Sequence, residues 1–427
     1  MAVINVLVFP CGSEIGLEIH TALKHNKAIR LHGVSSVADH GEYVYARYRE
    51  IAAKVDSKDF IEQLNGLIDE WQIDIVLPAH DSVVLELAER RSEVRARVAV
   101  PDAQVARVCR NKNATYAFFA GDAFIPQTVG EDIDAYPIFA KPAVGQGSQG
   151  AEIVHDAGRH QQLLACGVEY VFSEYLPGAE YTVDCISDHA GVLLNAFARE
   201  RMRVKSGISV STQLVPLDEA IGVIAGRISE ALCLQGAWFF QIKKDVQGRY
   251  KLMEIAPRIA GSMALSRNLG VNYPLLTIYA YLGLAFSVMG QHFPIRLDRA
   301  LGNRFRVEHV YDTVYLDLDD TLIVGGCVHP TIAALLYQWL SRDIDIILVT
   351  RHNRCPRETL KRYRIAHEVF SRIIHISDGS PKSAVIERGR PALFIDDSYR
   401  ERLDVSLNLG IPVFDIDAVE QLLDWRC

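Results

Sequence analysis

The chain has 427 residues, of which 49% are hydrophobic and 23% charged, and its formal net charge is −8. At roughly 150 residues per domain, this length indicates about three domains with cores of ordinary size. Because the charge is mildly negative and we recognise no block of lysine and arginine that would form a stripe, we expect neither nucleic acid nor an anionic membrane as a partner. Small molecules fit better.

The eight cysteines are scattered singly, without a CxxC pair, and the N-terminus lacks the pattern of a signal peptide. We therefore expect reduced thiols in a cytoplasmic protein. No apolar run reaches the roughly 20 residues that span a bilayer, so we expect no membrane segment. The composition leaves the oligomeric state open, a homo-oligomer included.

Apolar strands alternate with amphipathic helices in the N-terminal part of the chain. The pattern predicts strands over residues 3–9 and 74–79 and helices over residues 16–25 and 60–71. This alternation is typical of a parallel sheet flanked by helices. The turn PCGSEIG at residues 10–16 lacks the GxGxxG spacing, so we interpret it as a tight strand-to-helix turn and not as a dinucleotide site.

The pattern changes in the middle of the chain. Residues 113–124 predict a helix, hairpin-like strands follow, and residues 217–232 predict another helix. Strand signals begin again at residues 309–320 and alternate with helices to the end. This places the last domain boundary near residues 301–306.

Residues 138–154, IFAKPAVGQGSQGAEIV, place Lys141 at the end of a predicted strand and ahead of a glycine-rich loop. Gly145, Gly147 and Gly150 permit backbone conformations in which successive N–H groups turn toward one anion, and Lys141 adds a positive charge. The combination indicates phosphate binding. For this loop taken alone, a flexible hairpin with a surface lysine is the alternative.

Two later stretches carry acidic residues beside apolar strands. In residues 172–184, Glu174 and Glu180 flank a Pro-Gly hinge; in residues 238–262, Gln241 and Glu254 fall on adjacent strands joined by a QG turn. A carboxylate in an apolar strand, such as Glu254, needs a partner, and Mg²⁺ bridging nucleotide phosphates is a natural one.

Together these stretches resemble the ATP-grasp superfamily, in particular its carbamoyl-phosphate-synthetase-like and carboxylate-amine ligase branch. The resemblance covers about residues 1–300 and includes DIVLPAHDSVVLELAERR ahead of the glycine-rich loop. It implies a pre-ATP-grasp Rossmann-like domain over residues 1–110, an ATP-grasp α+β domain over residues 111–302, and ATP and Mg²⁺ as cofactors.

The resemblance also implies roles for single residues. The implied nucleotide-binding set is Lys112, Lys141 and Ser148 for the phosphates, Glu174, Tyr175 and Leu176 for adenine, and Glu180 for ribose. The implied metal and catalytic set is Gln241 and Glu254 for magnesium, Arg258 for the transferring phosphoryl group, and Arg203 with Lys205 on a mobile loop facing the active site.

In such a site ATP phosphorylates a carboxylate, and an amine displaces phosphate from the acyl phosphate to leave an amide and ADP. Small-molecule carboxylate and amine substrates are therefore implied. Where the family usually reads Glu-x-Asn-x-Arg, this chain has Ala256 between Glu254 and Arg258, and alanine cannot bind a metal. Either water or substrate replaces that ligand, or phosphoryl transfer is weakened or lost. His80 and Asp81 either face the cleft or form a surface turn.

Residues 315–324, YLDLDDTLIV, place three aspartates in an apolar run. Alternate residues of a strand share a face, so Asp317 and Asp319 would point together from the strand end while Asp320 points away. With Mg²⁺ between them, one carboxylate can attack phosphorus and the other can protonate the leaving oxygen.

Polar residues follow three further aliphatic runs, at Thr350, Lys382, Asp396 and Asp397. We expect them at the ends of predicted strands, and the C-terminal strand ends of an open parallel sheet form its ligand crevice. These side chains could therefore gather around one phosphate. Taken singly, they would be a capping threonine, a solvated lysine and turn aspartates.

Jointly they resemble the haloacid dehalogenase (HAD) phosphohydrolase superfamily, whose DxDx(T/V) motif is matched by Asp317, Asp319 and Thr321. The resemblance covers about residues 310–427, and we assign a HAD-like Rossmannoid domain to residues 307–427. The implied roles are Asp317 as nucleophile, Asp319 as general acid/base, Thr350 and Lys382 on the phosphoryl group, and Asp317, Asp319, Asp396 and Asp397 around Mg²⁺. The spacings from Thr321 to Thr350 and from Thr350 to Lys382 leave no room for an inserted cap domain.

Some residues receive an ordinary interpretation. Four histidines lack paired spacing and are interpreted as surface or capping residues: His329, His352, His367 and His375. The cluster Trp238, Phe239 and Phe240 is interpreted as core and not as a platform for bases.

The sequence thus predicts an α/β multidomain protein. The leading hypothesis is a bifunctional cytoplasmic enzyme, a carboxylate-amine ligase fused to a magnesium-dependent phosphatase that acts on a related phosphorylated metabolite. The alternative is a phosphatase whose ATP-grasp part binds nucleotide without catalysis. A third hypothesis is a scaffold with two vestigial sites.

Overall fold

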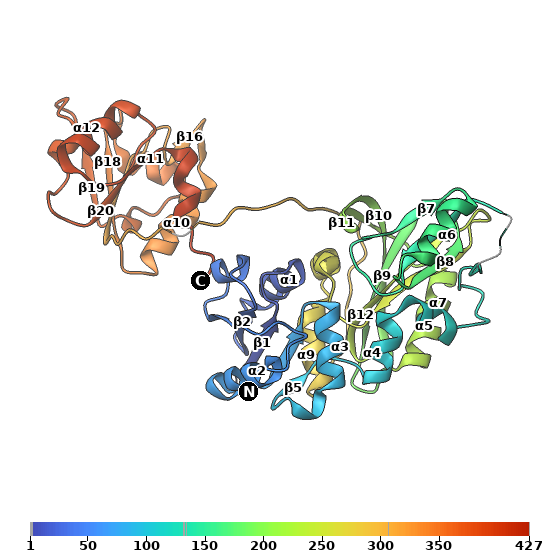
Figure 1. The fold of residues 1–427 in the computed structure, drawn as a ribbon. Coiled ribbons are helices and arrows are strands. Elements are labelled where there is room, and N and C mark those ends of the chain that lie inside the picture. Colours follow the sequence, from blue (N-terminus) through green and yellow to red (C-terminus); the bar gives the residue numbers. More distant parts are fainter. Residues whose placement is uncertain (1–2, 131–132, 134, 306, 427) are drawn as a thin grey trace. The chain divides into compact units, whose positions relative to one another are not determined.

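The structure, a computed structural model, describes residues 3–130, 133, 135–305 and 307–426. It forms two compact units, Met1–Leu301 (unit 1) and Gly302–Cys427 (unit 2) (Figure 1). Within the described ranges, no helix is long and apolar enough to cross a membrane. Cysteines 11, 109, 166, 185, 233, 327 and 355 are free thiols, as expected, and Cys427 lies outside the described residues.

Unit 1 begins with a parallel sheet of five strands in the order β3-β2-β1-β4-β5. Its strands are β1 (Ile4–Phe9), β2 (Ile29–Ser35), β3 (Tyr48–Glu50), β4 (Ile75–Pro78) and β5 (Arg97–Val98). The helices of this part are α1 (Glu14–Leu23), α2 (Phe60–Trp71), α3 (Asp81–Glu89), α4 (Ala103–Arg110) and α5 (Lys112–Phe118). The strands and helices predicted within residues 3–79 are confirmed, whereas the helix predicted over residues 113–124 already ends at Phe118. Helix α1 begins two residues early because the Ser13 side chain caps it by accepting from Gly16 N.

The rest of unit 1 contains two antiparallel sheets. The smaller has the order β7-β6-β8, from β6 (Ile138–Pro142), β7 (Glu152–Val154) and β8 (Tyr170–Glu174), with helix α6 (Ala157–Ala165). The larger has the order β13-β12-β9-β10-β11-β14. Its strands are β9 (Glu180–Ser187), β10 (Leu193–Lys205), β11 (Ile208–Val215), β12 (Gly236–Lys244), β13 (Tyr250–Ala256) and β14 (Arg296–Asp298).

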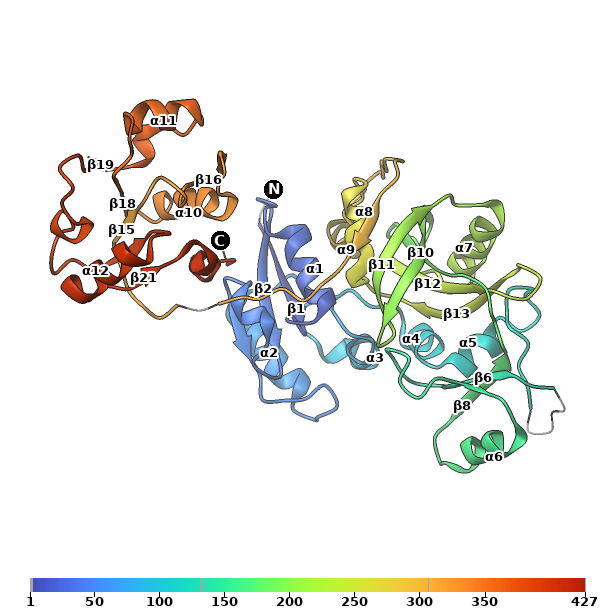
Figure 2. The same cartoon turned by 90° about the horizontal axis from the view of Figure 1, so that it is seen from above.

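Helix α7 (Glu219–Leu232) lies along one face of the larger sheet (Figure 2). There Ile224 and Ile228 join Trp238 and Phe240 in one core, which confirms the interpretation of these aromatic residues. Strand alternation turns the intervening Phe239 to the opposite face, where it lines a cleft. The remaining helices of unit 1 are α8 (Ala264–Asn268) and α9 (Tyr273–Tyr281).

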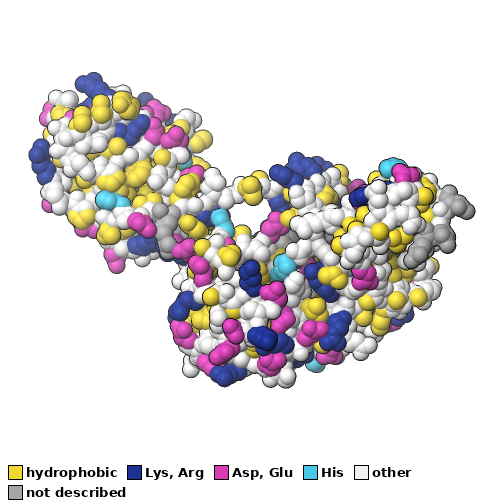
Figure 3. Space-filling view, in the orientation of Figure 1, with side chains coloured by type: hydrophobic (Ala, Val, Ile, Leu, Met, Phe, Trp, Pro, Cys, Tyr) yellow, Lys and Arg dark blue, Asp and Glu magenta, His cyan; other side chains and the backbone are white. Residues whose placement is uncertain are grey.

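Unit 2 is built on a parallel sheet of five strands in the order β19-β18-β15-β20-β21. The strands are β15 (Thr313–Leu316), β18 (Asp345–Thr350), β19 (Arg372–His375), β20 (Ala392–Ile395) and β21 (Val413–Phe414), with a hairpin of β16 (Ile323–Val324) and β17 (Cys327–Val328). The helices are α10 (Pro330–Leu340), α11 (Pro356–Arg362) and α12 (Tyr399–Leu409). Separate apolar cores cover the two faces, because Val314 and Leu316 face one core and Tyr315 the other. Charged side chains of both signs are interspersed on the visible face of each unit (Figure 3).

A buried ion pair joins β9 to β10 in unit 1. Arg199 Nε and Nη2 donate to the two carboxylate oxygens of Asp184 at 2.9 and 3.0 Å, and the two side chains are 1% and 0% exposed. Ser266 Oγ donates to the same carboxylate at 2.8 Å. Among the described residues, Arg199 Nη1 is buried without a partner, so the charge of Arg199 depends on Asp184 alone for its compensation.

Replacing Asp184 by alanine should lower the free energy of unfolding of unit 1 by about 3–5 kcal/mol, because Arg199 would remain buried without a counter-charge. Urea unfolding followed by circular dichroism measures this. The matched control is Asp298→Ala, which removes the partner of Arg203 in a pair that is 61% and 57% exposed, where we expect a loss below about 1 kcal/mol. An equal decrease in the free energy of unfolding for both variants would show that the buried Asp184–Arg199 pair stabilises the fold no more than an exposed pair.

Candidate active sites

A cleft in unit 1 runs between the N-terminal sheet and the larger antiparallel sheet. It encloses about 710 Å³, and an adjoining pocket of about 140 Å³ shares the glycine-rich loop, Gln241 and Glu254 with it. These volumes suit a ligand of nucleotide size with a small second substrate. Gln241 on β12 and Glu254 on β13 face each other in register, as predicted, and Arg201 Nη1 donates to Gln241 Oε1 at 2.9 Å.

Two lysines line the adjoining pocket. Lys141 on β6 is 6% exposed, and its Nζ donates to Tyr116 OH at 2.9 Å and to Met253 O at 2.8 Å. Burial lowers the pKa of Lys141 to about 8, although Glu254 opposes the change. Lys112, the first residue of α5, is also buried, and burial lowers its pKa as well. A third N–H of Lys141 remains for a ligand, since an ammonium has three donors.

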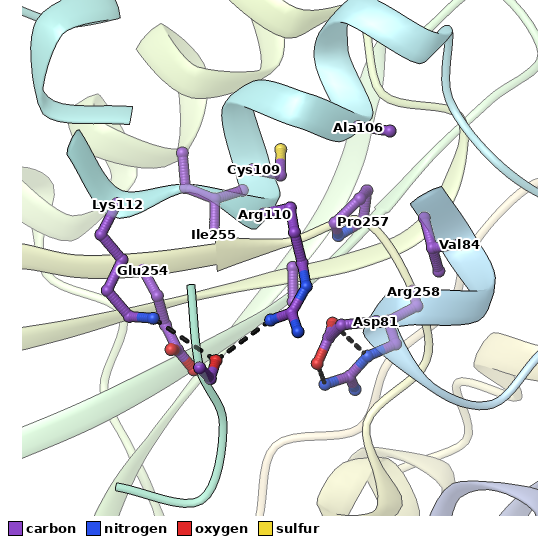
Figure 4. Close-up of a pocket in the computed structure, with 12 residues that line it drawn as sticks. Asp81, Val84, Ala106, Cys109, Arg110, Lys112, Glu254, Ile255, Pro257 and Arg258 are labelled. Atoms are coloured by element: carbon purple, nitrogen blue, oxygen red, sulfur yellow. Dashed lines mark hydrogen bonds and ion pairs between the residues drawn. The ribbon is translucent and has the colours of Figure 1, made fainter. Parts of the chain in front are cut away.

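Arg258 follows β13 and forms a bidentate ion pair with Asp81, the first residue of α3 (Figure 4). Its Nε and Nη2 lie 2.6 and 2.7 Å from the Asp81 carboxylate oxygens, and its guanidinium stands 5.2 Å from the centre of the Phe239 ring. Burial alone would lower the pKa of Arg258, but Asp81 outweighs it and the pKa is raised. Asp81 and His80 both line the cleft, so the cleft interpretation of these two residues is the right one.

The glycine-rich loop closes the pocket from the other side. Arg110 and Lys112 both donate to Gly145 O (Figure 4), and Ser148 lines the smaller pocket. The turn between β10 and β11 lies against this loop: a Cβ on Gly207 would stand 2.1 Å from the carbonyl carbon of Gly147. Only glycine permits this approach, and Gly207 also has a φ of +72°.

Not every expected residue lies at the cleft. Glu174, Tyr175 and Leu176 end β8 and its continuation and line neither pocket; Glu174 Oε1 accepts from Gln127 N at 2.8 Å. Glu180 does line the smaller pocket, where it pairs with Arg201.

The expectation for Arg203 and Lys205 is wrong. Both belong to strand β10 and not to a loop, and Arg203 pairs with Asp298 at 2.9 Å. A β-bulge shifts the register between Arg201 and Arg203, so Arg203 turns toward β14 while Arg201 faces the cleft. Arg201 is therefore a cleft residue that the sequence analysis did not identify.

The donors present fit a magnesium nucleotide. Gln241 and Glu254 offer oxygen atoms on facing strands, which is the donor type that Mg²⁺ prefers. Lys112, Lys141 and the loop glycines supply positive charge and backbone donors on the same side.

In unit 2, Lys382 bridges two buried carboxylates. Its Nζ lies 2.6 Å from Asp317 Oδ1 and 2.6 Å from Asp396 Oδ2. Burial raises the pKa of Asp317 to about 7, although Lys382 opposes the rise, and burial also raises the pKa of Asp396. Burial alone would lower the pKa of Lys382, but the two carboxylates outweigh it and the pKa is raised.

Asp397 completes an acidic group with Asp317 and Asp396. One oxygen atom from each of the three lies within 4.8 Å of the others, which suits a hard divalent cation. Thr321 Oγ1 accepts from Asp397 N at 2.9 Å, and Thr350 ends β18 fully buried. The structure therefore brings together Asp317, Thr350, Lys382, Asp396 and Asp397 from separate segments of the chain at one edge of the sheet.

Two expectations about positions in unit 2 are wrong. Strand β15 ends at Leu316, so Asp317 and Asp319 lie in the loop after it and do not share a strand face. Lys382 lies in a 3₁₀ turn, Lys382–Ala384, and not at a strand end, because Pro381 begins a turn after β19. Between Thr321 and Lys382 the chain forms the small hairpin, α10, β18, α11, a 3₁₀ turn and β19, without a further domain.

Asp319 has a partner that the sequence analysis dismissed. Its side chain is 51% exposed and lies 2.8 Å from His352 Nδ1, while His352 Nε2 lies 2.7 Å from Thr359 Oγ1 on α11. His352 is thus not an ordinary surface histidine, whereas His329 caps α10 as expected. The available signal was its place two residues after Thr350, at the edge where Asp317 and Asp396 converge.

A family model described as ATP-grasp in the biosynthetic pathway with Ter operon matches residues 168–298, all within unit 1. No curated protein matches the chain significantly. Among solved structures, the ADP complex of N5-carboxyaminoimidazole synthetase from Staphylococcus aureus is 13% identical with a TM-score of 0.56, covering 70% of this chain and 83% of that one.

Two other solved structures are similar. The biotin carboxylase domain of Hydrogenobacter thermophilus 2-oxoglutarate carboxylase, complexed with MgADP, ADP and bicarbonate, is 16% identical with a TM-score of 0.54, covering 67% of this chain and 72% of that one. An L-amino acid ligase from Bacillus licheniformis is 16% identical with a TM-score of 0.53, covering 66% of this chain and 75% of that one. The family match inside unit 1 and these likenesses together show that the chain carries the fold of the ATP-grasp superfamily.

Proposed function

We propose that unit 1 is an ADP-forming ligase that joins a small-molecule carboxylate to an amine. The observation that carries the proposal is that Lys112, Glu254 and Arg258 line one small pocket beside the cleft, while Lys141 is buried in the adjoining pocket that Lys112 and Glu254 also line. The nucleotide in two of the similar structures and the ligase activity named for the third support it. The proposed division is a pre-ATP-grasp domain over residues 1–110 and an ATP-grasp domain over residues 111–302.

The residues of the cleft have separate tasks in this proposal. Lys112 and Lys141 bind the phosphates of ATP, and Gln241 and Glu254 hold Mg²⁺, which neutralises phosphate charge when bound. Arg258, fixed in orientation by Asp81, stabilises charge on the phosphoryl group as it passes to the substrate carboxylate.

The test is ADP release from Mg-ATP in the presence of pooled carboxylates and amines. We expect release that depends on one member of each pool, because ligation needs both substrates. ADP release that needs neither pool would contradict a ligase.

We propose that unit 2 is a phosphomonoester hydrolase of the HAD type, over residues 307–427, acting on a phosphorylated metabolite. The observation that carries this is that Lys382 Nζ lies 2.6 Å from a carboxylate oxygen of both Asp317 and Asp396, with Asp397 beside them. Asp317 attacks phosphorus and becomes phosphorylated, and Asp319 protonates the leaving oxygen and then takes a proton from the attacking water. Lys382 and Thr350 bind the phosphoryl oxygens. The proposed magnesium ligands are Asp317, Asp396 and Asp397, together with Asp319, which lies in the same loop as Asp317.

Removing divalent metal should stop both reactions. Excess EDTA is expected to reduce ADP release and phosphate release below about a hundredth of their rates, because both sites depend on Mg²⁺ to neutralise phosphate charge. Adding Mg²⁺ back should restore both, which separates metal loss from unfolding. Full phosphatase activity in EDTA would contradict the assignment of Asp396 and Asp397.

A specific residue favours a second candidate for unit 1, a nucleotide-binding module without catalysis. Ala256 is buried on β13, pairs in register with Phe239, and offers no ligand atom for a second metal. Calorimetry that detects ATP binding, together with an absence of ADP from every substrate pool, would favour this candidate over the ligase.

A further inference from the structure

Helix α11 and its flanks carry an unusual concentration of positive charge. Between residues 351 and 372 the chain has seven lysines and arginines and two glutamates, although the protein as a whole is negative. Six of these cations are exposed: Arg354, Arg357, Lys361, Arg362, Arg364 and Arg372. The sequence analysis recognised no such block; other residues interrupt these cations along the chain.

None of these six pairs with a carboxylate among the described residues. Elsewhere in unit 2 arginines are commonly paired, as in Arg390 with Asp312 and Asp345. Arg351, at the start of the segment, is also paired, with Glu401 at 2.6 Å. Six unpaired cations within one short segment repel one another, so they favour an anionic partner.

The cationic segment borders the proposed phosphatase site. It begins directly after Thr350, the last residue of β18, at the sheet edge that also holds Asp317 and Asp396. Helix α11 is connected to Asp319 by two short contacts, Asp319 to His352 at 2.8 Å and His352 to Thr359 at 2.7 Å. Arg362 lies one helical turn from Thr359 and therefore on the same face of α11.

We propose that unit 2 acts on a phosphomonoester that carries at least one further phosphate, which the cations of α11 and its flanks bind while Asp317 faces the phosphate that is removed. This rests on the proposed hydrolase function of unit 2. Since the described chain between Thr321 and Lys382 contains no inserted domain, a substrate larger than a single phosphomonoester can extend from Asp317 across α11 within unit 2. A small bisphosphate and the phosphorylated end of an oligonucleotide share this chemistry.

The test compares hydrolysis of thymidine 5′-monophosphate, thymidine 3′,5′-bisphosphate and a 5′-phosphorylated tetrathymidylate, with p-nitrophenyl phosphate as a general substrate. In wild-type protein at low salt, kcat/KM should be about tenfold higher for the bisphosphate or the oligonucleotide than for the monophosphate. The advantage should shrink between about 20 and about 200 mM salt, because exposed charges are screened. Preference for the bisphosphate over the oligonucleotide, or the reverse, identifies which source of phosphate the segment serves.

The double variant Arg354→Glu with Arg362→Glu should remove this advantage. The control is Arg388→Glu, which makes the same substitution once, and so half the charge change, at an exposed residue near the opposite, N-terminal end of β20 and should preserve the advantage. Equal kcat/KM for mono- and bisphosphate in wild-type protein, or the same loss in control and double variant, would overturn the proposal.

Failure of the hydrolase function is distinguishable. If p-nitrophenyl phosphate is not hydrolysed, the proposed hydrolase function is wrong. Calorimetric binding of thymidine 3′,5′-bisphosphate then tests separately whether the cations of α11 and its flanks bind phosphate. We expect the wild-type protein to bind the bisphosphate, the double variant Arg354→Glu with Arg362→Glu to bind it about tenfold more weakly, and Arg388→Glu to bind it as the wild type does. Unchanged binding in the double variant contradicts it.

Discussion

Replacing Asp317 by asparagine should reduce hydrolysis of p-nitrophenyl phosphate by about a thousandfold or more, because the amide cannot act as the nucleophile. Asparagine has the size of aspartate and can keep a hydrogen bond to Lys382, which retains its pair with Asp396 at 2.6 Å. The fold of unit 2 should therefore persist, and circular dichroism of the purified variant checks this. Phosphate release under saturating Mg²⁺ measures the effect.

Asp320 supplies the matched control in the same loop. It is exposed and has a φ of +53°, a conformation that asparagine adopts readily. Asp320→Asn should keep the wild-type rate within a factor of about two, since surface substitutions away from special features have small effects. Hydrolysis that survives Asp317→Asn would remove Asp317 from the reaction and with it the HAD-type mechanism.

Replacing Lys141 by methionine should reduce ADP release by about a hundredfold or more. The methionine side chain fills most of the volume of the buried lysine stem but removes the ammonium that faces the smaller pocket. Charge stabilisation of phosphates by a preorganised, buried cation is a large contribution to phosphoryl transfer. Coupled detection of ADP, with the active substrate pools present, measures the change.

Lys205→Met is the control for this variant. Lys205 is exposed at the end of β10 and lines neither the cleft nor the adjoining pocket. It should release ADP at close to the wild-type rate. Equal loss of activity in both variants would show that the buried position of Lys141 is not what matters. If neither variant loses activity, the proposed binding of the ATP phosphates by Lys141 is wrong.

Much of the fold could be predicted because local patterns agree with tertiary packing. The spacing of apolar residues predicted α2 over residues 60–71, where Phe60, Leu64 and Leu67 are now seen in the core. The QG turn predicted that β12 and β13 form a hairpin, but a register shift between Gln241 and Ile242 is what sets Gln241 opposite Glu254.

Other features depend on contacts that no local pattern encodes. The bulge after Arg201 turns Arg203 away from the cleft and leaves Arg201 facing it, and bulges have no reliable signature in one sequence. The pairing of Arg258 with Asp81 joins residues 177 positions apart, so neither residue signals the other. His352 was dismissed because its partner Asp319 lies 33 residues away, on a different loop.

The central claim is that the chain has two separate magnesium-dependent pockets for phosphoryl groups. A crystal grown with Mn²⁺ in place of Mg²⁺ and a nonhydrolysable ATP analogue tests it through the anomalous signal of the metal. The account predicts one set of peaks beside Gln241 and Glu254, next to the nucleotide phosphates, and another among Asp317, Asp396 and Asp397. A nucleotide bound without metal at Glu254, or a metal-free carboxylate group in unit 2, would contradict it.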